Sequence, residues 1–260
     1  MKLQNVLIVH KIGFSESEKK AFHEVLEVIK KKKIMHRVIS LLEVHADMIH
    51  ERDLIIVVGG DGTFLKTAHA MHTKIPFLCI NADPTKTEGF FSQTTAATVE
   101  KKIEQILKGK CKPKQLWRLQ ARIDGTSIEQ CMNEYYIGEQ KPYHVSKYIM
   151  DIGKKKEMQK SSGVIVSTAA GSTAWCRSAG GKVMPIDKRQ FEFIVRDPYV
   201  GRLAKTKLKK GILEKDATVT IIPVSENMIL VADAVGKEYP VQKTSKVIIQ
   251  QSEKPLYLFY

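Results

Sequence analysis

Short apolar runs alternate with amphipathic stretches through the first hundred residues, and this alternation limits the folds open to the chain. The apolar runs have the composition of strands, and they are Asn5–Lys11, His36–Leu41, Asp53–Val58 and Ile75–Ile80. The stretches between and after them place apolar residues at helical spacing, and they are Ser15–Lys33, Thr63–His72 and Thr98–Gly109. Strands with so little polar alternation are typical of a parallel sheet covered by helices. The sequence therefore predicts an α/β domain over residues 1–110.

The pattern changes from residue 111 onward. Lysine and proline interrupt the chain, and short alternating segments replace the long helices. Asp124-Gly125 lies between two strand-like runs and Gly153 divides another pair, which are hairpin signals. We expect a second, mostly β domain over residues 111–260, whose last strand is a candidate to pack back on the first domain.

Length and cysteine usage place the chain among cytoplasmic proteins. A chain of 260 residues can bury two cores of its own. Its four cysteines form no CxxC pair, and no histidine stands at zinc-finger spacing, so neither a disulfide framework nor a zinc site is indicated. The first apolar run is too short for a signal peptide, and no run approaches the roughly 20 apolar residues of a membrane span. We expect a cytoplasmic protein without a membrane partner.

The formal net charge of +14 favours an acidic partner. The densest basic run, Lys30–Lys33, ends a predicted helix, where cations complement the helix dipole. No RNA-binding aromatic signature accompanies the charge, so we expect no nucleic-acid partner. A polyphosphate metabolite suits the charge better.

The stretch VVGGDGTF, Val57–Phe64, adds a candidate site to the predicted sheet. Gly59-Gly60 lets the chain turn at the end of a strand, and Thr63 can start a helix whose first N–H groups bind anions. Open α/β sheets bind ligands at this edge. Asp61 stands out because a carboxylate repels phosphates unless it binds magnesium, orients a hydroxyl or accepts its proton. The motif therefore suggests phosphoryl transfer, whereas the simpler alternative is a tight turn that tolerates an aspartate.

A second stretch of small and hydroxyl-bearing residues runs from Ser161 to Gly181. It contains a short strand and then a predicted helix that begins near Gly171. Hydroxyls in this stretch are candidates to bond sugars or phosphates, and they belong to Thr168, Ser172, Thr173 and Ser178. The alternative is a helix with an ordinary cap, where Ser and Thr are favoured.

A polar pair, Asn133-Glu134, interrupts a strand-like segment between these two stretches. At least one of the two side chains should point inward, and burying a polar side chain costs free energy unless it has a hydrogen-bond partner. An amide beside a carboxylate suits the hydroxyls of a ribose and the edge of an adenine.

At these three stretches together the sequence resembles the NAD kinase family. The family's GGDGT is intact at Gly59–Thr63, its NE pair at Asn133-Glu134 and its TxxGSTA stretch at Thr168–Ala174. The resemblance implies transfer of the γ-phosphoryl group of ATP to the 2′-hydroxyl of the adenosine ribose of NAD, which gives NADP. It also implies a Rossmann-like parallel sheet in the first domain, a β-rich NAD-binding second domain, a substrate site between the domains, and a homodimer or higher homo-oligomer.

The resemblance assigns a role to particular residues. Asp61 would orient or deprotonate the 2′-hydroxyl, and Mg²⁺ would accompany the phosphates of ATP, with no metal ligand from the protein. The residues that would bind NAD are Asn81, Asn133, Glu134, Thr173, Ala174, Trp175 and Ser178. The residues that would contact phosphates or ATP are Gly59, Gly60, Gly62, Thr63, Arg196 and Arg202.

Several positions depart from the common family pattern. Many bacterial members carry a short NxGxLGF loop, whereas this chain has the longer NADPTKTEGFF at Asn81–Phe91, a form that resembles the branch containing the animal mitochondrial NAD kinase. Ser162 replaces a usual acid, and Trp175 replaces a usual tyrosine, which keeps a stacking ring without the phenol hydroxyl. Asp233 lies near a family Asp-Gly pair but lacks the glycine, and we interpret it as a hairpin aspartate.

Two other functional classes stay open from the sequence. A lipid kinase of the diacylglycerol or sphingosine type would explain Asp61, but it would require an apolar access groove for the lipid, which the polar STAAGST run does not supply. A non-catalytic nucleotide-binding module would keep the glycines and lose the acid.

Overall fold

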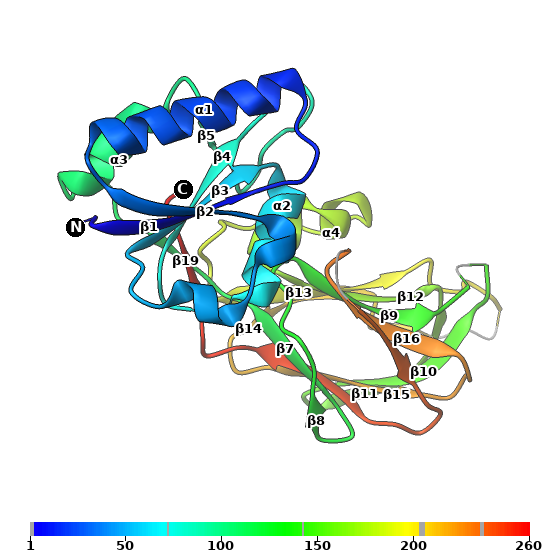
Figure 1. Cartoon of the computed structure of the whole chain (residues 1–260). Helices are drawn as coiled ribbons and strands as arrows, with labels where there is room; N and C mark the ends of the chain where they lie inside the picture. Colours follow the sequence, from blue (N-terminus) through cyan, green and yellow to red (C-terminus); the bar gives the residue numbers. More distant parts are fainter. Residues whose placement is uncertain (1–2, 72, 142, 203–205, 235–236) are drawn as a thin grey trace. The chain divides into compact units, whose positions relative to one another are not determined.

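A computed structural model of the chain describes residues 3–71, 73–141, 143–202, 206–234 and 237–260 (Figure 1). The chain divides into two compact units. The first comprises Met1–Gln115 with Leu256–Tyr260, and the second comprises Leu116–Pro255. The second unit is therefore inserted, in chain order, between two parts of the first.

The first unit is built on a seven-stranded sheet with the order β2-β1-β3-β4-β19-β6, in which β5 also pairs with β4. Its strands are β1 (Asn5–His10), β2 (Met35–Ser40), β3 (Leu54–Gly59), β4 (Phe77–Asn81), β5 (Thr94–Thr95), β6 (Lys114–Leu116) and β19 (Leu256–Leu258). β1 pairs in parallel with β2 and β3, and β4 pairs in parallel with β3, β5 and β19. The predicted parallel sheet is confirmed.

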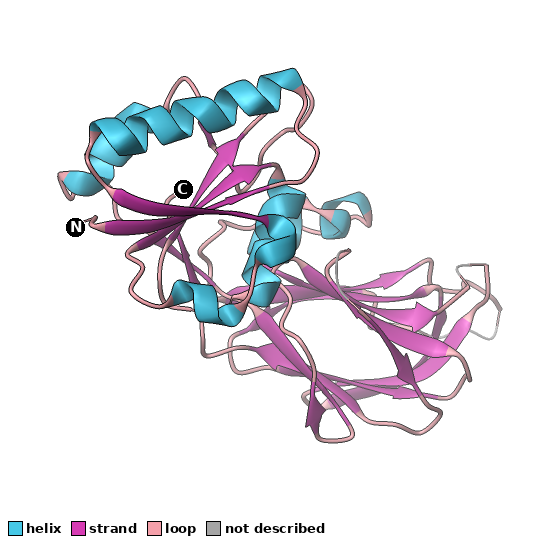
Figure 2. Ribbon diagram, viewed as in Figure 1, coloured by secondary structure: helices cyan, strands magenta, loops and turns pink. Residues whose placement is uncertain are grey.

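Helices cover both faces of this sheet (Figure 2). They are α1 (Glu16–Lys31), α2 (Asp61–Ala70) and α3 (Val99–Leu107), with the 3₁₀ turns η1 (Leu41–Glu43) and η2 (Ala46–Ile49). Val25 and Ile29 of α1 share one buried cluster with Ile103 of α3 and with strand residues such as Ile56. Phe64 of α2 packs against Phe77, with ring centroids 5.7 Å apart. Burying each such side chain contributes about 1.5 to 3 kcal/mol.

The second unit consists of two six-stranded sheets that share one core. One sheet is formed by β11 (Lys155–Ser161), β10 (Ser146–Ile152), β15 (Thr218–Pro223), β18 (Val247–Gln251), β7 (Leu119–Ile123) and β8 (Thr126–Ser127). The other is formed by β14 (Lys210–Glu214), β13 (Gln190–Arg196), β12 (Gly163–Thr168), β9 (Glu134–Glu139), β16 (Met228–Ala232) and β17 (Glu238–Val241). Tyr148 and Ile249 of the first sheet lie in the same buried cluster as Ile137 and Leu230 of the second. This shared cluster is the arrangement of a β-sandwich.

The hairpins expected in the second unit are present. Asp124 and Gly125, with φ of 50° and 84°, connect the antiparallel β7 and β8. Gly153, with φ of 63°, connects β10 and β11.

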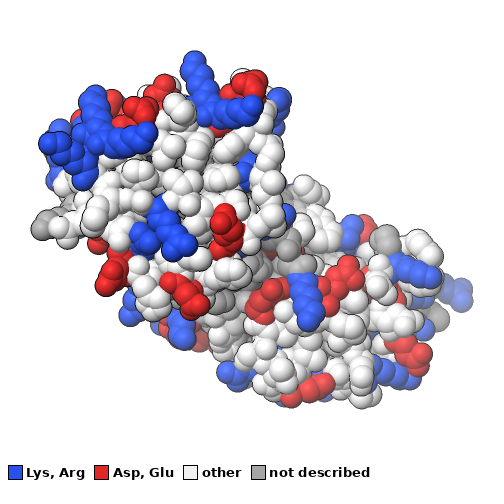
Figure 3. Space-filling view, in the orientation of Figure 1, with Lys and Arg blue, Asp and Glu red and all other residues white. Residues whose placement is uncertain are grey.

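The basic run at the end of α1 contacts acidic residues of α3. Lys31 Nζ lies 2.7 Å from Glu100 Oε1, and Lys32 Nζ lies 2.5 Å from Glu104 Oε1. Figure 3 shows basic and acidic side chains interspersed on this part of the first unit. Exposed ion pairs stabilise a fold only slightly. Within the described residues, none of the helices combines the length and the apolar character needed to cross a membrane.

Candidate active site

Asp61 is the first residue of α2, directly after β3. Gly60 is the helix N-cap, so the helix begins two residues before the predicted start at Thr63. The carboxylate therefore lies in the first helical turn, where the dipole stabilises negative charge. The chain leaves β1 toward α1 on one face of the sheet and leaves β3 toward α2 on the other (Figure 1). Open α/β sheets bind ligands at such a switch point.

The Asp61 carboxylate holds the loop that follows β4. Its Oδ2 accepts a hydrogen bond from the Phe90 N–H at 2.7 Å. Its Oδ1 accepts from the Phe91 N–H at 3.0 Å and from the Ser92 N–H and hydroxyl at 3.2 and 3.0 Å. Hydrogen bonds to an ionised acceptor are among the stronger ones in proteins. These four bonds fix the orientation of the acid that the sequence analysis predicts to be catalytic.

The glycines of the GGDGT motif divide into two kinds. A Cβ at Gly59 would lie 2.4 Å from Thr63 Oγ1, so this glycine makes room for the buried Thr63 side chain. A Cβ at Gly62 would meet nothing within 4 Å, and one at Gly60 would make only an ordinary contact with Thr87. Packing between β3 and α2 thus explains Gly59 and Thr63, whereas Gly60 and Gly62 leave the backbone open to a ligand.

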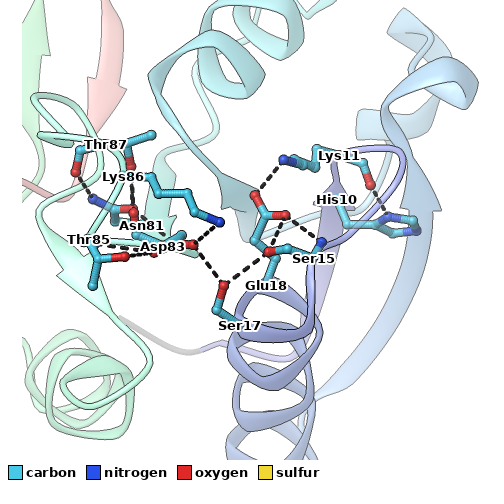
Figure 4. Close-up of polar contacts among 10 residues, drawn as sticks. All are labelled: His10, Lys11, Ser15, Ser17, Glu18, Asn81, Asp83, Thr85, Lys86 and Thr87. Atoms are coloured by element: carbon cyan, nitrogen blue, oxygen red, sulfur yellow. Dashed lines mark hydrogen bonds and ion pairs between the residues drawn. The ribbon is translucent and has the colours of Figure 1, made fainter.

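The loop after β4 is fastened by two polar side chains (Figure 4). The buried Asn81 donates from Nδ2 to the Thr87 carbonyl at 3.0 Å and accepts from the Thr87 hydroxyl at 2.8 Å. Asp83 accepts from the Thr85 hydroxyl at 2.6 Å and from the Ser17 hydroxyl of α1 at 2.8 Å, and these bonds hold the pKa of Asp83 well below its usual value. The Asn81 amide is thus used within its own loop, and a contact with NAD would require it to exchange these partners.

In the second unit, Asn133 directly precedes β9 and Glu134 begins it. The Asp233 carboxylate binds the backbone here, since its Oδ2 accepts from the Met132 N–H at 2.8 Å and its Oδ1 from the N–H groups of Asn133 and Glu134 at 2.6 and 3.1 Å. Asp233 lies in the turn after β16, with φ of 46°, as expected of a hairpin aspartate. Its contact with the NE pair is a role that the sequence did not suggest.

The side chains of the NE pair carry buried oxygens without partners. Within the described parts of the chain, Asn133 Oδ1 and Glu134 Oε2 are buried and have no hydrogen-bond partner. Burial, and then the negative charge of Asp233, raise the pKa of Glu134 to about 8. A buried polar atom left unpaired costs about 1 to 3 kcal/mol. Such atoms indicate a binding site whose ligand supplies the missing partners.

A cavity of 200 Å³ adjoins Glu134. Its lining consists of Glu134, Tyr136, Trp175, Val231, Asp233 and Ala234. The rings of Tyr136 and Trp175 lie 5.2 Å apart, and the Arg196 guanidinium lies 4.8 Å from the Trp175 ring. Aromatic side chains beside a few polar groups are typical of the lining of a small-molecule site.

The TxxGSTA stretch packs against the backbone of the NE pair. The predicted helix near Gly171 is two short pieces, η3 (Ala170–Thr173) and α4 (Trp175–Ser178). A Cβ at Gly171 would lie 2.2 Å from the Asn133 carbonyl oxygen, so only glycine allows this approach. The Thr168 hydroxyl donates to the Met132 carbonyl at 2.7 Å, and the Ser172 hydroxyl donates to the Ala169 carbonyl at 2.7 Å. Because Thr168 and Ser172 are fully buried, the suggestion that their hydroxyls bind sugars or phosphates is wrong.

The other predicted site residues are less enclosed. Thr173 and Ala174 are half-buried, and Ser178 and Arg202 are exposed. The structure thus places Glu134 and Trp175 on one cavity and leaves Ser178 and Arg202 outside its lining. Over the described ranges, no group of three or more His, Cys, Asp or Glu side chains is arranged to hold a metal ion.

Two family models match the chain. The ATP-NAD kinase N-terminal domain matches residues 5–111, and the ATP-NAD kinase C-terminal domain matches residues 132–260. The chain belongs to the ATP-NAD kinase family. It is therefore an ATP-dependent NAD kinase, as the sequence predicted. Neither match supports the lipid kinase alternative.

The curated relatives of the chain include proteins from plants and archaea. A probable NADH kinase of Oryza sativa subsp. japonica is 30% identical over 68% of this chain, and the match spans 62% of that protein. The NADH kinase of Arabidopsis thaliana is 27% identical over 90% of this chain and 80% of its own length. The NAD kinase of Thermoplasma acidophilum is 30% identical over 77% of this chain and 71% of its own length.

Solved structures confirm the predicted fold class. An NAD kinase from Archaeoglobus fulgidus in complex with ATP superposes with a TM-score of 0.80 at 20% identity, over 99% of this chain and 94% of that one. Yeast NADH kinase complexed with NADH gives a TM-score of 0.81 at 18% identity, over 98% of this chain and 83% of that one.

Proposed function

We propose that the protein transfers the γ-phosphoryl group of ATP to the 2′-hydroxyl of the adenosine ribose of NAD or NADH. The observation that carries the proposal is the Asp61 carboxylate, which is fixed at the carboxyl end of a parallel strand in the first turn of a helix. Both dinucleotides are included because the relatives are named as NAD kinases and as NADH kinases. Phosphoryl transfer depends mainly on positioning and charge, so few protein groups are needed.

In this proposal Asp61 orients the 2′-hydroxyl and accepts its proton. Among the described residues, Asp61 Oδ2 accepts only the Phe90 N–H, whereas Oδ1 accepts three hydrogen bonds. A carboxylate has about four lone-pair sites, so Oδ2 keeps capacity for one more donor. We assign that capacity to the substrate hydroxyl.

The second unit supplies the NAD-binding domain of the proposal, within residues 111–260. The unpaired oxygens of Asn133 and Glu134 support their role as acceptors for dinucleotide hydroxyls or amines. The residues proposed to bind NAD are these two with Asn81, Thr173, Ala174, Trp175 and Ser178. The residues proposed to contact phosphates or ATP are Gly59, Gly60, Gly62, Thr63, Arg196 and Arg202.

Magnesium enters the proposal as the companion of ATP. Mg²⁺ usually keeps several waters and binds substrate phosphates with one or two carboxylates. There it would neutralise phosphate charge during transfer.

Three finer expectations stay predictions. They are a homodimer or higher homo-oligomer, a cytoplasmic location, and a place in the branch containing the animal mitochondrial NAD kinase. The relatives named above are plant and archaeal proteins, so they do not support that branch.

The proposal is tested with purified protein, ATP, Mg²⁺ and either NAD or NADH. A dehydrogenase that uses only the 2′-phosphorylated cofactor reports the product, and we expect NADP or NADPH to form. A parallel reaction offers diacylglycerol or sphingosine in micelles. Phosphorylation of lipid without any phosphorylated dinucleotide would overturn the proposal.

A further inference from the structure

The Asp233 carboxylate contacts the backbone segment that carries the NE pair. Its two oxygens accept from three successive N–H groups, those of Met132, Asn133 and Glu134. We propose that Asp233 is a positioning residue of the dinucleotide site, which acts by holding this segment so that the Asn133 and Glu134 side chains face the ligand. The inference rests on the proposed function and adds a residue to it.

Asp233 extends the pairing of β16 with β9 beyond the last backbone pair. That pair is Ala232 opposite Tyr135. One residue further along, the Asp233 N–H donates to the Glu134 carbonyl at 2.9 Å, while its side chain accepts from the two N–H groups before β9 and from the first N–H of β9. Asp233 is 2% exposed, so water cannot replace these bonds readily. Its left-handed backbone suits aspartate or asparagine better than most side chains.

The same segment is held from its other side by the start of the TxxGSTA stretch. The Thr168 N–H donates to the Asn133 carbonyl at 2.8 Å, and the Thr168 hydroxyl donates to the Met132 carbonyl at 2.7 Å. The three N–H groups thus donate to the Asp233 carboxylate, and the Met132 and Asn133 carbonyls accept from Thr168. A fixed backbone that presents unpaired Asn133 Oδ1 and Glu134 Oε2 is the design of a preorganised binding site.

Asp233 also sets the electrostatic environment of Glu134. The titratable groups near this carboxyl are Asp233 after β16, Cys131 before β9, Tyr136 on β9 and Cys176 on α4. Burial raises the pKa of Cys131 well above its usual value, that of Cys176 to about 12, and that of Tyr136. These three groups are therefore neutral near neutral pH, and Asp233 is the charge that Glu134 senses.

The test compares Asp233→Asn with Asp124→Asn as a matched control. Asp124 also has a positive φ, and its carboxylate accepts a distant backbone N–H, that of Lys246 at 2.7 Å, but it lies in the β7–β8 turn. Asparagine keeps the turn geometry at either position and loses the charge. We expect Asp233→Asn to raise the KM for NAD about tenfold or more with kcat within about twofold, and Asp124→Asn to change neither.

The pH profile of kcat/KM separates positioning from loosened packing. Burial and the Asp233 charge raise the pKa of Glu134 to about 8, so removal of that charge should move the corresponding inflection to lower pH. Glu134→Gln should abolish the inflection, which assigns it. Packing damage alone would lower activity and leave the inflection where it was, and that result, or an unchanged KM, would overturn the inference.

Folding and the parent reaction are checked separately. If thermal unfolding shows that Asp233→Asn does not fold, Asp233→Gly tolerates the same φ of 46° and carries the same expectations. A parent protein that phosphorylates neither NAD nor NADH would contradict the proposed function. An active parent with an unaffected Asp233 variant would contradict only the positioning role.

Discussion

The two units hold their important acids in opposite ways. Both oxygens of Asp61 in the first unit already accept hydrogen bonds, four in all, from the loop after β4. Glu134 in the second unit is 5% exposed and has one oxygen without a partner among the described residues. The first acid is oriented before any substrate arrives, whereas the second gains a partner only from a ligand.

This difference predicts which kinetic constant each acid controls. An oriented acid that acts on the reacting hydroxyl contributes in the transition state, so its loss appears in kcat. An acid that pairs with a bound sugar contributes equally before and during reaction, so its loss appears in KM. The contrast between the two acids would be contradicted if loss of Asp61 changed mainly KM and loss of Glu134 changed mainly kcat.

The largest effect is expected at Asp61. Asp61→Asn should lower turnover by about two to four orders of magnitude, the usual size of a general-base effect, with little change in NAD affinity. Steady-state kinetics and calorimetric titration with NAD measure the two quantities. Ser92→Ala is the control, since it removes one hydroxyl donor and keeps the carboxylate, and it should cost less than about tenfold. Turnover of Asp61→Asn within tenfold of the parent would remove Asp61 from the chemistry.

The next effect concerns Glu134. Glu134→Ala should raise the KM for NAD about tenfold to a hundredfold and leave kcat nearly unchanged, because it removes acceptors from the bound sugar. Glu192→Gln is a matched control, since Glu192 is also buried but accepts from the Lys182 N–H at 2.9 Å within its own unit. If the KM for NAD were unchanged in Glu134→Ala, the sugar of NAD would not contact Glu134.

A smaller effect is expected from Gly171, where the second unit keeps its site rigid. Gly171→Ala would drive a Cβ toward the Asn133 carbonyl, which is backbone and cannot turn aside. We expect a loss of about 1 to 3 kcal/mol in unfolding free energy, read from denaturant titration. An unchanged unfolding midpoint would show that the backbone at Asn133 can shift to admit the Cβ. The segment of the NE pair would then be less rigid than the loop that holds Asp61.

The last effect is a pH dependence of stability. The pKa of Glu134 is raised from 4.5 to about 8 in the folded chain, so the folded state binds the proton more tightly than the unfolded state. Stability contributed by the protonated carboxyl is complete below about pH 4.5 and is lost as pH rises through 8. Glu134→Gln should remove this loss and raise Tm relative to the parent by about 5 °C at pH 9. Parallel Tm curves for the two proteins from pH 5 to 9 would contradict it.

Much of the fold could be predicted because burial dictates composition locally. β3 and β4 are buried along their whole length, and this requires the uninterrupted apolar runs seen at Leu54–Gly59 and Phe77–Asn81. Turns at Asp124-Gly125 and Gly153 carry their own chemical signature. The short pieces η3 and α4 were harder to predict from the sequence, because hydroxyl residues are equally suited to helix caps, to ligand contacts and to hydrogen bonds with the backbone.

The site was less predictable because its key contacts use the backbone. Asp61 binds N–H groups about 30 residues away, and Asp233 binds N–H groups about 100 residues away, and every residue type except proline carries such a group. The prediction that Thr168 and Ser172 bind a ligand was wrong for the same reason. The sequence cannot distinguish a hydroxyl that donates to a backbone carbonyl from one that binds a sugar. The sequence pointed to Asp233 only through its position near the family's Asp-Gly pair, from which the glycine is missing here.

The strand β19 has a consequence for how the protein is made. Leu258 pairs with Phe77 of β4, and Phe259 is 2% exposed in the core of the first unit, yet the whole second unit is encoded before them. Domains generally fold as units while the chain leaves the ribosome. The first unit therefore lacks one strand of its sheet until residues 256–259 have been made, which follow the whole second unit in the chain.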